Sequence, residues 1–187
     1  TGPSGVCIVE EFLAAGYAVT IYHTGRHEVD FTAPTEHIHG DPREEADIRD
    51  KLGSRRWDLA VCTSGRLRSL ALCLAGRVRR LVGITGQPVY LGTMQPTPAG
   101  TLALPIPEHA PRQFDASGYT GKVAIGEDQL FEQHRQGAFE AVVVRYPGFY
   151  GPRGSLSHEW AVVRRILDGR TRMILPHDGM AYFQRGY

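Results

Sequence analysis

Short apolar runs alternate with amphipathic segments along most of the chain. Strands are predicted over Tyr17–Tyr22, His37–Pro42, Trp57–Thr63, Arg80–Tyr90, Ala141–Arg145 and Arg172–Leu175. Helices are predicted over Val9–Gly16, Pro42–Leu52, Arg66–Gly76 and His158–Gly169, and one more begins at Tyr119. Strands that alternate with helices in this way predict an α/β fold with a parallel sheet and helices on both of its faces.

Two of the predicted helices carry an apolar stripe that we expect to face a core. The stripe of the helix over residues 66–76 consists of Leu67, Leu70, Ala71 and Leu74. The stripe of the last helix consists of Trp160, Val163, Ile166 and Leu167. Because residues three and four apart share one face of a helix, both stripes predict packing rather than a binding site.

A glycine turn precedes the first predicted helix. Gly2 and Gly5 allow the backbone to turn and to approach a ligand without a Cβ in the way. The unpaired amides and the dipole at a helix N-terminus both favour negative charge. The turn therefore predicts a phosphate site, with a plain β/α turn as the alternative.

Thr1-Gly2-x-x-Gly5, followed by this helix and strand, resembles the cofactor fingerprint of the extended and atypical short-chain dehydrogenase/reductases, the NAD-dependent epimerase/dehydratase family. Ile8 stands where the family has a third glycine, so we expect the helix to tilt or move outward. The resemblance implies a Rossmann-like, doubly wound parallel sheet, incomplete at both ends of the chain. Residues 1–150 would form the NAD(P)-binding domain and residues 151–187 the start of a truncated substrate lobe.

The resemblance also implies that the chain is a fragment that lacks the first strand and most of the substrate lobe. In a doubly wound sheet the first strand is central. Its absence predicts a gap in the sheet, where backbone groups and apolar side chains lack a neighbour.

The tip of the second strand selects the cofactor in this fold. An acidic residue there favours NAD and an arginine favours NADP; this tip has no acid but has Arg26, which predicts NADP over NAD. The alternative is a solvated turn arginine. The full set of residues that we assign to the cofactor is Gly2, Pro3, Ser4, Gly5, Val6, His23, Arg26, Asp41, Thr63, Ser64, Gly65, Tyr119, Lys122, Tyr146, Pro147 and Gly148.

The catalytic pattern is altered. The family places a Ser or Thr four residues before the tyrosine at position 90, but Gly86 stands there, and the neighbouring Thr85 points to the other side of a strand. Thr85 is the substitute hydroxyl, and Gln87 and Tyr90 are assigned to the substrate. Of all the departures from the family pattern, this one argues most strongly against an enzyme.

Tyr119 begins a helix and matches the tyrosine of the family's Tyr-x-x-x-Lys pattern. Val123 occupies the lysine position, and Lys122 lies one residue early but on nearly the same helix face. An ammonium group near the phenol would lower its pKa and make Tyr119 an acid or base near neutral pH. The alternative is an aromatic anchor followed by a solvated lysine.

The segment Tyr146-Pro147-Gly148-Phe149-Tyr150-Gly151-Pro152-Arg153 resembles the family's Arg-Pro-x-x-Tyr-Gly-Pro segment, which passes the nicotinamide. Arg153 is assigned to the substrate. Glu159-Trp160, Arg164, Leu167, Gly169-Arg170 and Pro176 also resemble the atypical branch that includes chloroplast stem-loop RNA-binding proteins, in which the catalytic residues drift.

The composition of the chain limits the kinds of binding partner that we expect. A net charge of +1 predicts no large basic surface, which disfavours nucleic acid. Three cysteines without metal spacing fit a reduced, cytoplasmic setting, and no apolar run is long enough for a membrane span. His37 and His39 share a strand face but lack a third ligand, so no metal site is predicted. A homodimer stays open.

Two functions follow from these residues. The first is an NAD(P)-dependent oxidoreductase or epimerase/dehydratase that acts on a sugar nucleotide or a similar hydroxylated carbonyl. The alternative is a non-catalytic nucleotide-binding or RNA-associated protein that keeps the same fold.

Overall fold

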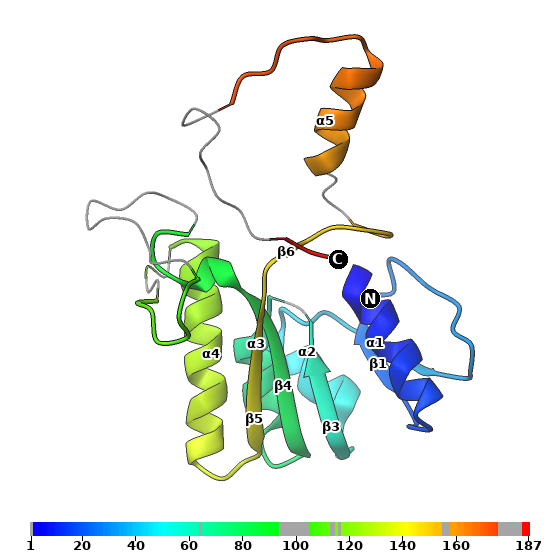
Figure 1. Ribbon diagram of the computed structural model, residues 1–187. Helices are drawn as coiled ribbons and strands as arrows, with labels where there is room; N and C mark the ends of the chain where they lie inside the picture. The colour runs from blue at the N-terminus through cyan, green and yellow to red at the C-terminus, as the bar shows by residue number, and fades with distance from the viewer. Residues whose placement is uncertain are drawn as a thin grey trace. The chain divides into compact units, whose positions relative to one another are not determined.

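The computed structural model describes residues 2–63, 65–93, 105–112, 115, 117–154, 158–175 and 185–187. The chain divides into two compact units, Thr1–Arg145 and Tyr146–Tyr187 (Figure 1). The division falls five residues before the boundary expected from the sequence.

The strands of the first unit form two separate sheets. Strand β1 (Thr20–His23) pairs in parallel with β2 (Glu36–His39). Strands β3 (Trp57–Cys62), β4 (Val78–Gly86) and β5 (Glu140–Tyr146) form a sheet in the order β3-β4-β5, in which β3 and β4 are parallel (Figure 1). Parallel pairing places the carboxyl ends of β1 and β2 at one edge, and likewise those of β3 and β4.

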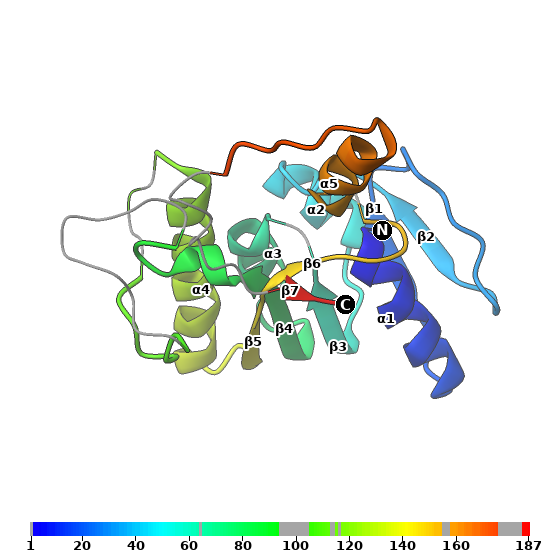
Figure 2. The same ribbon diagram turned by 45° about the horizontal axis from the view of Figure 1, so that its top comes forward.

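Helices follow the strands as the pattern predicts. They are α1 (Pro3–Ala14), α2 (Glu45–Leu52), α3 (Leu67–Leu74) and α4 (Tyr119–Arg135), with the short 3-10 helix η1 (Gln87–Val89) after β4. In the turned view of Figure 2, α4 is seen lengthwise beside β5 and β4. Helix α3 packs against both α2 and α4.

The first helix begins earlier than predicted and ends in a defined cap. Pro3 occupies its first turn, where a fixed φ and a missing N–H suit a helix start. At its end Gly16 has φ +83°, the Tyr17 amide donates to the Phe12 carbonyl at 3.0 Å, and the two rings stack edge to face. This is a Schellman cap with its hydrophobic contact. Because Tyr17 closes the helix, β1 starts at Thr20 rather than at Tyr17.

The main core lies between the helices and the β3-β4-β5 sheet. The predicted stripe of α3 faces it: Leu67, Ala71 and Leu74 are buried and Leu70 packs at the edge. The prediction for this stripe is confirmed. The other buried members are Ile48, Leu52, Cys62, Cys73, Val78, Leu81, Leu130 and Phe139.

A cavity of about 740 Å³ separates β1 from β3. All residues of both strands line it, together with Ile8, Val9 and Phe12 of α1. Strands β1 and β3 each pair on one side only among the described residues. The cavity therefore follows two strand edges, and Gly2, Gly5, His23 and Thr63, which the sequence assigns to the cofactor, also line it.

The second unit contains little regular structure. Strand β6 (Gly148–Phe149) pairs in parallel with β7 (Arg185–Gly186), and α5 (His158–Leu167) is its helix. The strand predicted over residues 172–175 is wrong, because that segment is exposed and has no pairing partner among the described residues.

The apolar stripe of α5 does not face a core. Trp160, Val163, Ile166 and Leu167 are between 43% and 69% exposed. The expectation that they point inward is wrong for the described structure, since no described element of this unit covers them.

Among the described residues, no helix is both long and apolar enough to cross a membrane.

Candidate cofactor and catalytic site

The N-terminus of α1 is suited to an anion. Gly2 is its N-cap, and a Cβ built on Gly2 would meet nothing within 4 Å. Within the described part of the chain, the first turn of α1 has no acidic residue and no side chain caps it. The positive end of the helix dipole therefore has no negative side chain to neutralise it. A dinucleotide's diphosphate fits this environment chemically.

Ile8 faces the gap between the sheets rather than the start of the helix. It is half-buried and lines the cavity between β1 and β3, whereas Val6 and Val9 are buried. The Gly5 amide donates to the Gly2 carbonyl at 3.0 Å, which closes the first turn.

The tips of β1 and β2 place Arg26 and Asp41 near each other. Arg26 is exposed in the turn after β1, next to Gly25 with φ +72°. A hydrogen bond from the Arg43 amide, and then the charges of Arg43 and Arg26, hold the pKa of Asp41 below its ordinary value. Arg26 and Asp41 thus both follow the carboxyl ends of β1 and β2, at the edge where the sequence predicts the adenosine ribose.

His23, the last residue of β1, belongs to a different group of side chains. Its Nε2 lies 3.0 Å from Nδ1 of His37 and 3.8 Å from a carboxylate oxygen of Glu28. Burial, partly offset by the Glu28 charge, lowers its pKa. The ring is therefore directed to its neighbours on β2 and in the following loop.

Tyr119 lies at the tip of β3. A Cβ on Gly65 would be 3.5 Å from Cε2 of the Tyr119 ring and 3.8 Å from its hydroxyl. The ring is 70% exposed, so the phenol is open to solvent beside the residue predicted to contact the cofactor ribose. Thr63 is exposed at the same tip, and Ser64 lies outside the described residues.

Lys122 is exposed one turn further along α4. Val123, at the position where the family has its lysine, is half-buried. Lys122 is therefore the cation of α4 nearest to Tyr119 in sequence, and its contact with a ribose stays a prediction.

Thr85 directs its hydroxyl into the protein. Its Oγ donates to Oε1 of Glu127 at 2.7 Å, and Glu127 is fully buried. Arg145 donates to the same carboxylate through Nε at 3.1 Å and Nη2 at 2.7 Å. The Thr85 hydroxyl thus supports a buried ion pair in this structure.

The Glu127 carboxylate is shared by two arginines. Arg112 Nη1 donates to Glu127 Oε2 at 2.9 Å, and its Nη2 donates to Asp128. Burial alone would raise the pKa of Glu127, but the hydrogen bonds from Arg145 and Thr85 outweigh burial and hold that pKa below its ordinary value. The carboxylate is therefore charged and joins α4 to β4, β5 and the preceding loop.

Tyr90 and Gln87 sit at the exit of β4. Tyr90 is 6% exposed, its hydroxyl accepts a 2.6 Å hydrogen bond from Arg145 Nη1, and the Arg145 guanidinium lies 4.8 Å from the centre of its ring. Gln87 is half-buried and starts η1. Tyr90 is thus part of the buried arginine network, and a substrate contact by either residue stays a prediction.

Sequence reasoning missed Glu127, Arg112 and Arg145. Their signal is weak, because a glutamate within a polar helix reads as a solvated face.

The remaining predicted residues belong to the second unit. Tyr146 ends β5, Gly148 begins β6, and the Pro147 ring packs 3.2 Å from where a Cβ on Gly186 would lie. Arg153 is exposed, with φ +65°. A place for these residues beside the nicotinamide or the substrate stays a prediction.

No protein-family model matches the sequence, and no curated protein is significantly similar to it. Solved structures do match. The Bordetella bronchiseptica enzyme WbmG in complex with NAD has a TM-score of 0.72 at 16% identity, over 92% of this chain and 58% of WbmG. The chain has the Rossmann-like epimerase fold.

Two further structures with this epimerase fold agree. The B. bronchiseptica enzyme WbmH in complex with NAD+ has a TM-score of 0.71 at 17% identity, over 90% of this chain and 60% of WbmH. A UDP-glucose 4-epimerase of Thermus thermophilus in complex with NAD has a TM-score of 0.63 at 20% identity, over 90% of this chain and 60% of the epimerase. This chain thus spans about three fifths of the epimerase-fold proteins that it matches. The fold expected from the sequence is confirmed.

Proposed function

We propose that the chain acts as an NAD(P)-dependent oxidoreductase or epimerase/dehydratase on a sugar nucleotide or a similar hydroxylated carbonyl substrate. The position of Tyr119 carries this proposal, since its phenol stands open beside Gly65 at the tip of β3. Ligands of α/β sheets bind beyond the carboxyl ends of the strands, which is where this phenol lies.

The chain's own residues have three tasks. The amides at the start of α1, beside the open Gly2, hold the diphosphate. Tyr119 moves a proton to or from a substrate oxygen, and Lys122 supplies positive charge that favours the phenolate. A bound nicotinamide supplies hydride transfer.

We further propose that the chain prefers NADP to NAD. Arg26, exposed beyond β1, favours the 2′-phosphate of NADP, whereas WbmG and WbmH are complexes with NAD. Fluorescence titration of the purified chain with NADPH and NADH tests both cofactor binding and this preference. Arg26→Ala should weaken NADPH binding and leave NADH binding unchanged. Arg55→Ala is the control, because Arg55 pairs with Glu36 at the opposite end of β2, and it should leave the binding of both cofactors unchanged.

Turnover tests the role of Tyr119. With the preferred cofactor and UDP-sugars as substrates, Tyr119→Phe should lower kcat by roughly 100-fold or more, the contribution of a general acid or base. Tyr17→Phe, which removes the hydroxyl of another exposed tyrosine, should leave kcat unchanged. Equal rates for Tyr119→Phe and the unmodified chain would rule out proton transfer by Tyr119.

The second candidate is a nucleotide-binding protein without catalysis, or an RNA-associated one. Two observations favour it: the Thr85 hydroxyl is bound to buried Glu127, and Val123 replaces the family's lysine. Cofactor binding without turnover of any substrate would support this candidate. A net charge of +1 argues against RNA.

We propose a reduced compartment, the cytoplasm, as the setting. Cys7 and Cys73 carry free thiols in the structure, and the three cysteines lack metal spacing.

A further inference from the structure

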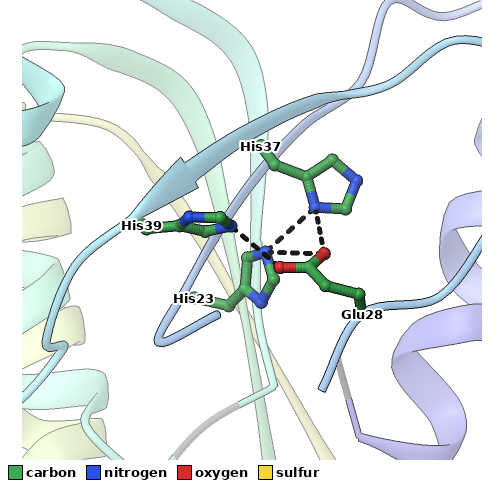
Figure 3. Close-up of side chains that lie close together, drawn as sticks. All are labelled: His23, Glu28, His37 and His39. Atoms are coloured by element: carbon green, nitrogen blue, oxygen red, sulfur yellow. Dashed lines mark hydrogen bonds and ion pairs between the residues drawn. The ribbon is translucent and has the colours of Figure 1, made fainter. Parts of the chain in front are cut away.

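Four side chains converge at the carboxyl ends of β1 and β2. They are His23 at the end of β1, His37 and His39 on β2, and Glu28 from the loop that joins the two strands (Figure 3). One ligand atom from each lies within 4.8 Å of every other. Sequence reasoning recognised only the pair on β2.

The strand register explains why the three histidines meet. His23 is paired with His39, and Ile21 is paired with His37. Paired residues of neighbouring strands point to the same face, and so do residues two apart on one strand. The three rings therefore project from one face of this two-stranded sheet, with His23 and His39 5.0 Å apart between ring centres.

The loop brings the carboxylate to the rings. Glu28 Oε1 lies 2.9 Å from His39 Nε2, and Oε2 lies 3.1 Å from His37 Nδ1. Gly25 turns the loop with φ +72°, and a Cβ there would lie 3.4 Å from the His39 ring. The backbone at Gly25 thus passes directly beside the cluster. Figure 3 shows the Glu28 carboxylate among the three imidazole rings.

We propose that His23, Glu28, His37 and His39 bind one divalent transition-metal ion, with Zn²⁺ as the first candidate. Ligand atoms about 2.0–2.1 Å from a tetrahedral zinc ion lie roughly 3.4 Å from one another. In the structure, His39–Glu28, His23–His37, His37–Glu28 and His23–Glu28 are 2.9, 3.0, 3.1 and 3.8 Å apart, and the ligand atoms of the four residues all lie within 4.8 Å of one another. Imidazole nitrogen and carboxylate oxygen are ligands that zinc, copper and nickel accept.

The bound ion would hold the loop of Glu28 against the sheet. His23 and His37 are 11% and 24% exposed, whereas His39 and Glu28 are 57% and 52% exposed. Two ligands are thus fixed in the structure and two close the site from the solvent side. The proposal rests on these side chains alone and does not depend on the proposed function.

Metal titration of the tag-free, chelator-treated chain tests the site. Calorimetry with Zn²⁺, and absorption spectra with Co²⁺ as a tetrahedral reporter, should show one equivalent bound at micromolar concentration or below. His39→Ala and Glu28→Gln should each weaken binding by at least roughly 10- to 100-fold, the loss seen even for residues that only support a ligand. At one Zn²⁺ concentration, the Tm of the unmodified chain should rise more than that of these variants.

His27→Ala is the matched control, because His27 is exposed in the same loop and is not part of the cluster. It should bind Zn²⁺ as the unmodified chain does. His23 is nearly buried, so if His23→Ala does not fold, the variants at His39 and Glu28 decide the result. Absence of Zn²⁺ and Co²⁺ binding below millimolar concentration, or binding unchanged in His39→Ala and Glu28→Gln, would overturn the proposal.

Discussion

Replacing Glu127 with alanine should destabilise the chain more than any substitution at a surface carboxylate. Glu127 is fully buried and accepts hydrogen bonds from Thr85, Arg112 and Arg145. After its removal, the guanidinium groups of Arg112 and Arg145 keep different acceptors. Arg112 keeps its ion pair with Asp128. Arg145, which is 19% exposed, keeps only oxygens without charge, from Tyr90 and the Glu108 backbone, among the described residues.

The expected loss of unfolding free energy follows from this difference between the two arginines. Removing one partner of a buried ion pair costs about 3–5 kcal/mol, because the other charge stays buried without compensation. The retained pair of Arg112 with Asp128 places the expectation in the lower half of that range. For a chain of this size each kcal/mol lowers Tm by roughly 2–4 °C, so Tm should fall by roughly 6–16 °C.

Urea unfolding followed by circular dichroism measures the loss. Glu132→Ala is the control, because Glu132 lies on the same helix and pairs with Arg135 at the surface, where it is 44% exposed. The control should lose about 1 kcal/mol or less. Equal losses in the two variants would refute the reasoning that the Glu127 network holds α4 to the sheet.

Two further predictions concern the first unit. The folded-state pKa of Glu127 lies below its ordinary value, so Glu127 contributes stability that is present above the unfolded-state pKa of about 4.3 and is lost as pH falls through the folded-state pKa. The difference in unfolding free energy between the unmodified chain and Glu127→Gln should therefore shrink below pH 4. A constant difference from pH 7 to pH 3 would contradict this prediction. Gly40→Ala should cost about 1–3 kcal/mol, because the added Cβ would press against the Asp47 carboxylate and lie 2.6 Å from the Tyr22 ring. At Gly65 the nearest atom is 3.5 Å away, so Gly65→Ala should cost little in the same unfolding assay.

The sequence predicts the fold well because periodicity is a local property. The local pattern of the leucine stripe of α3 and of the apolar runs of β3 and β5 indicates which residues form helix and strand, and the structure places these elements as predicted. The stripe of α5 failed, because periodicity says that a face is apolar and not what covers it.

The candidate sites depend on long-range pairing, which one sequence does not reveal. Glu127 meets Thr85 from 42 residues away and Arg145 from 18 residues away. The metal ligands needed the register of two parallel strands, because a shift by one residue would turn His23 to the opposite face from His39. Motif spacing located Tyr119 at a helix start, but its place beside Gly65 came from the packing of α4.

The cofactor residues assigned from the sequence and the proposed metal site share His23, and the geometry decides how the two combine. The sequence assigns His23 to the cofactor ribose, yet its Nε2 faces His37 and Glu28. A ring nitrogen that coordinates a cation cannot also accept a hydrogen bond from a ribose hydroxyl. Ribose recognition would then fall to Arg26 and Asp41, whose charges already influence each other at the same edge. A bound cation would add positive charge there, which favours the extra phosphate of NADP over the hydroxyl of NAD.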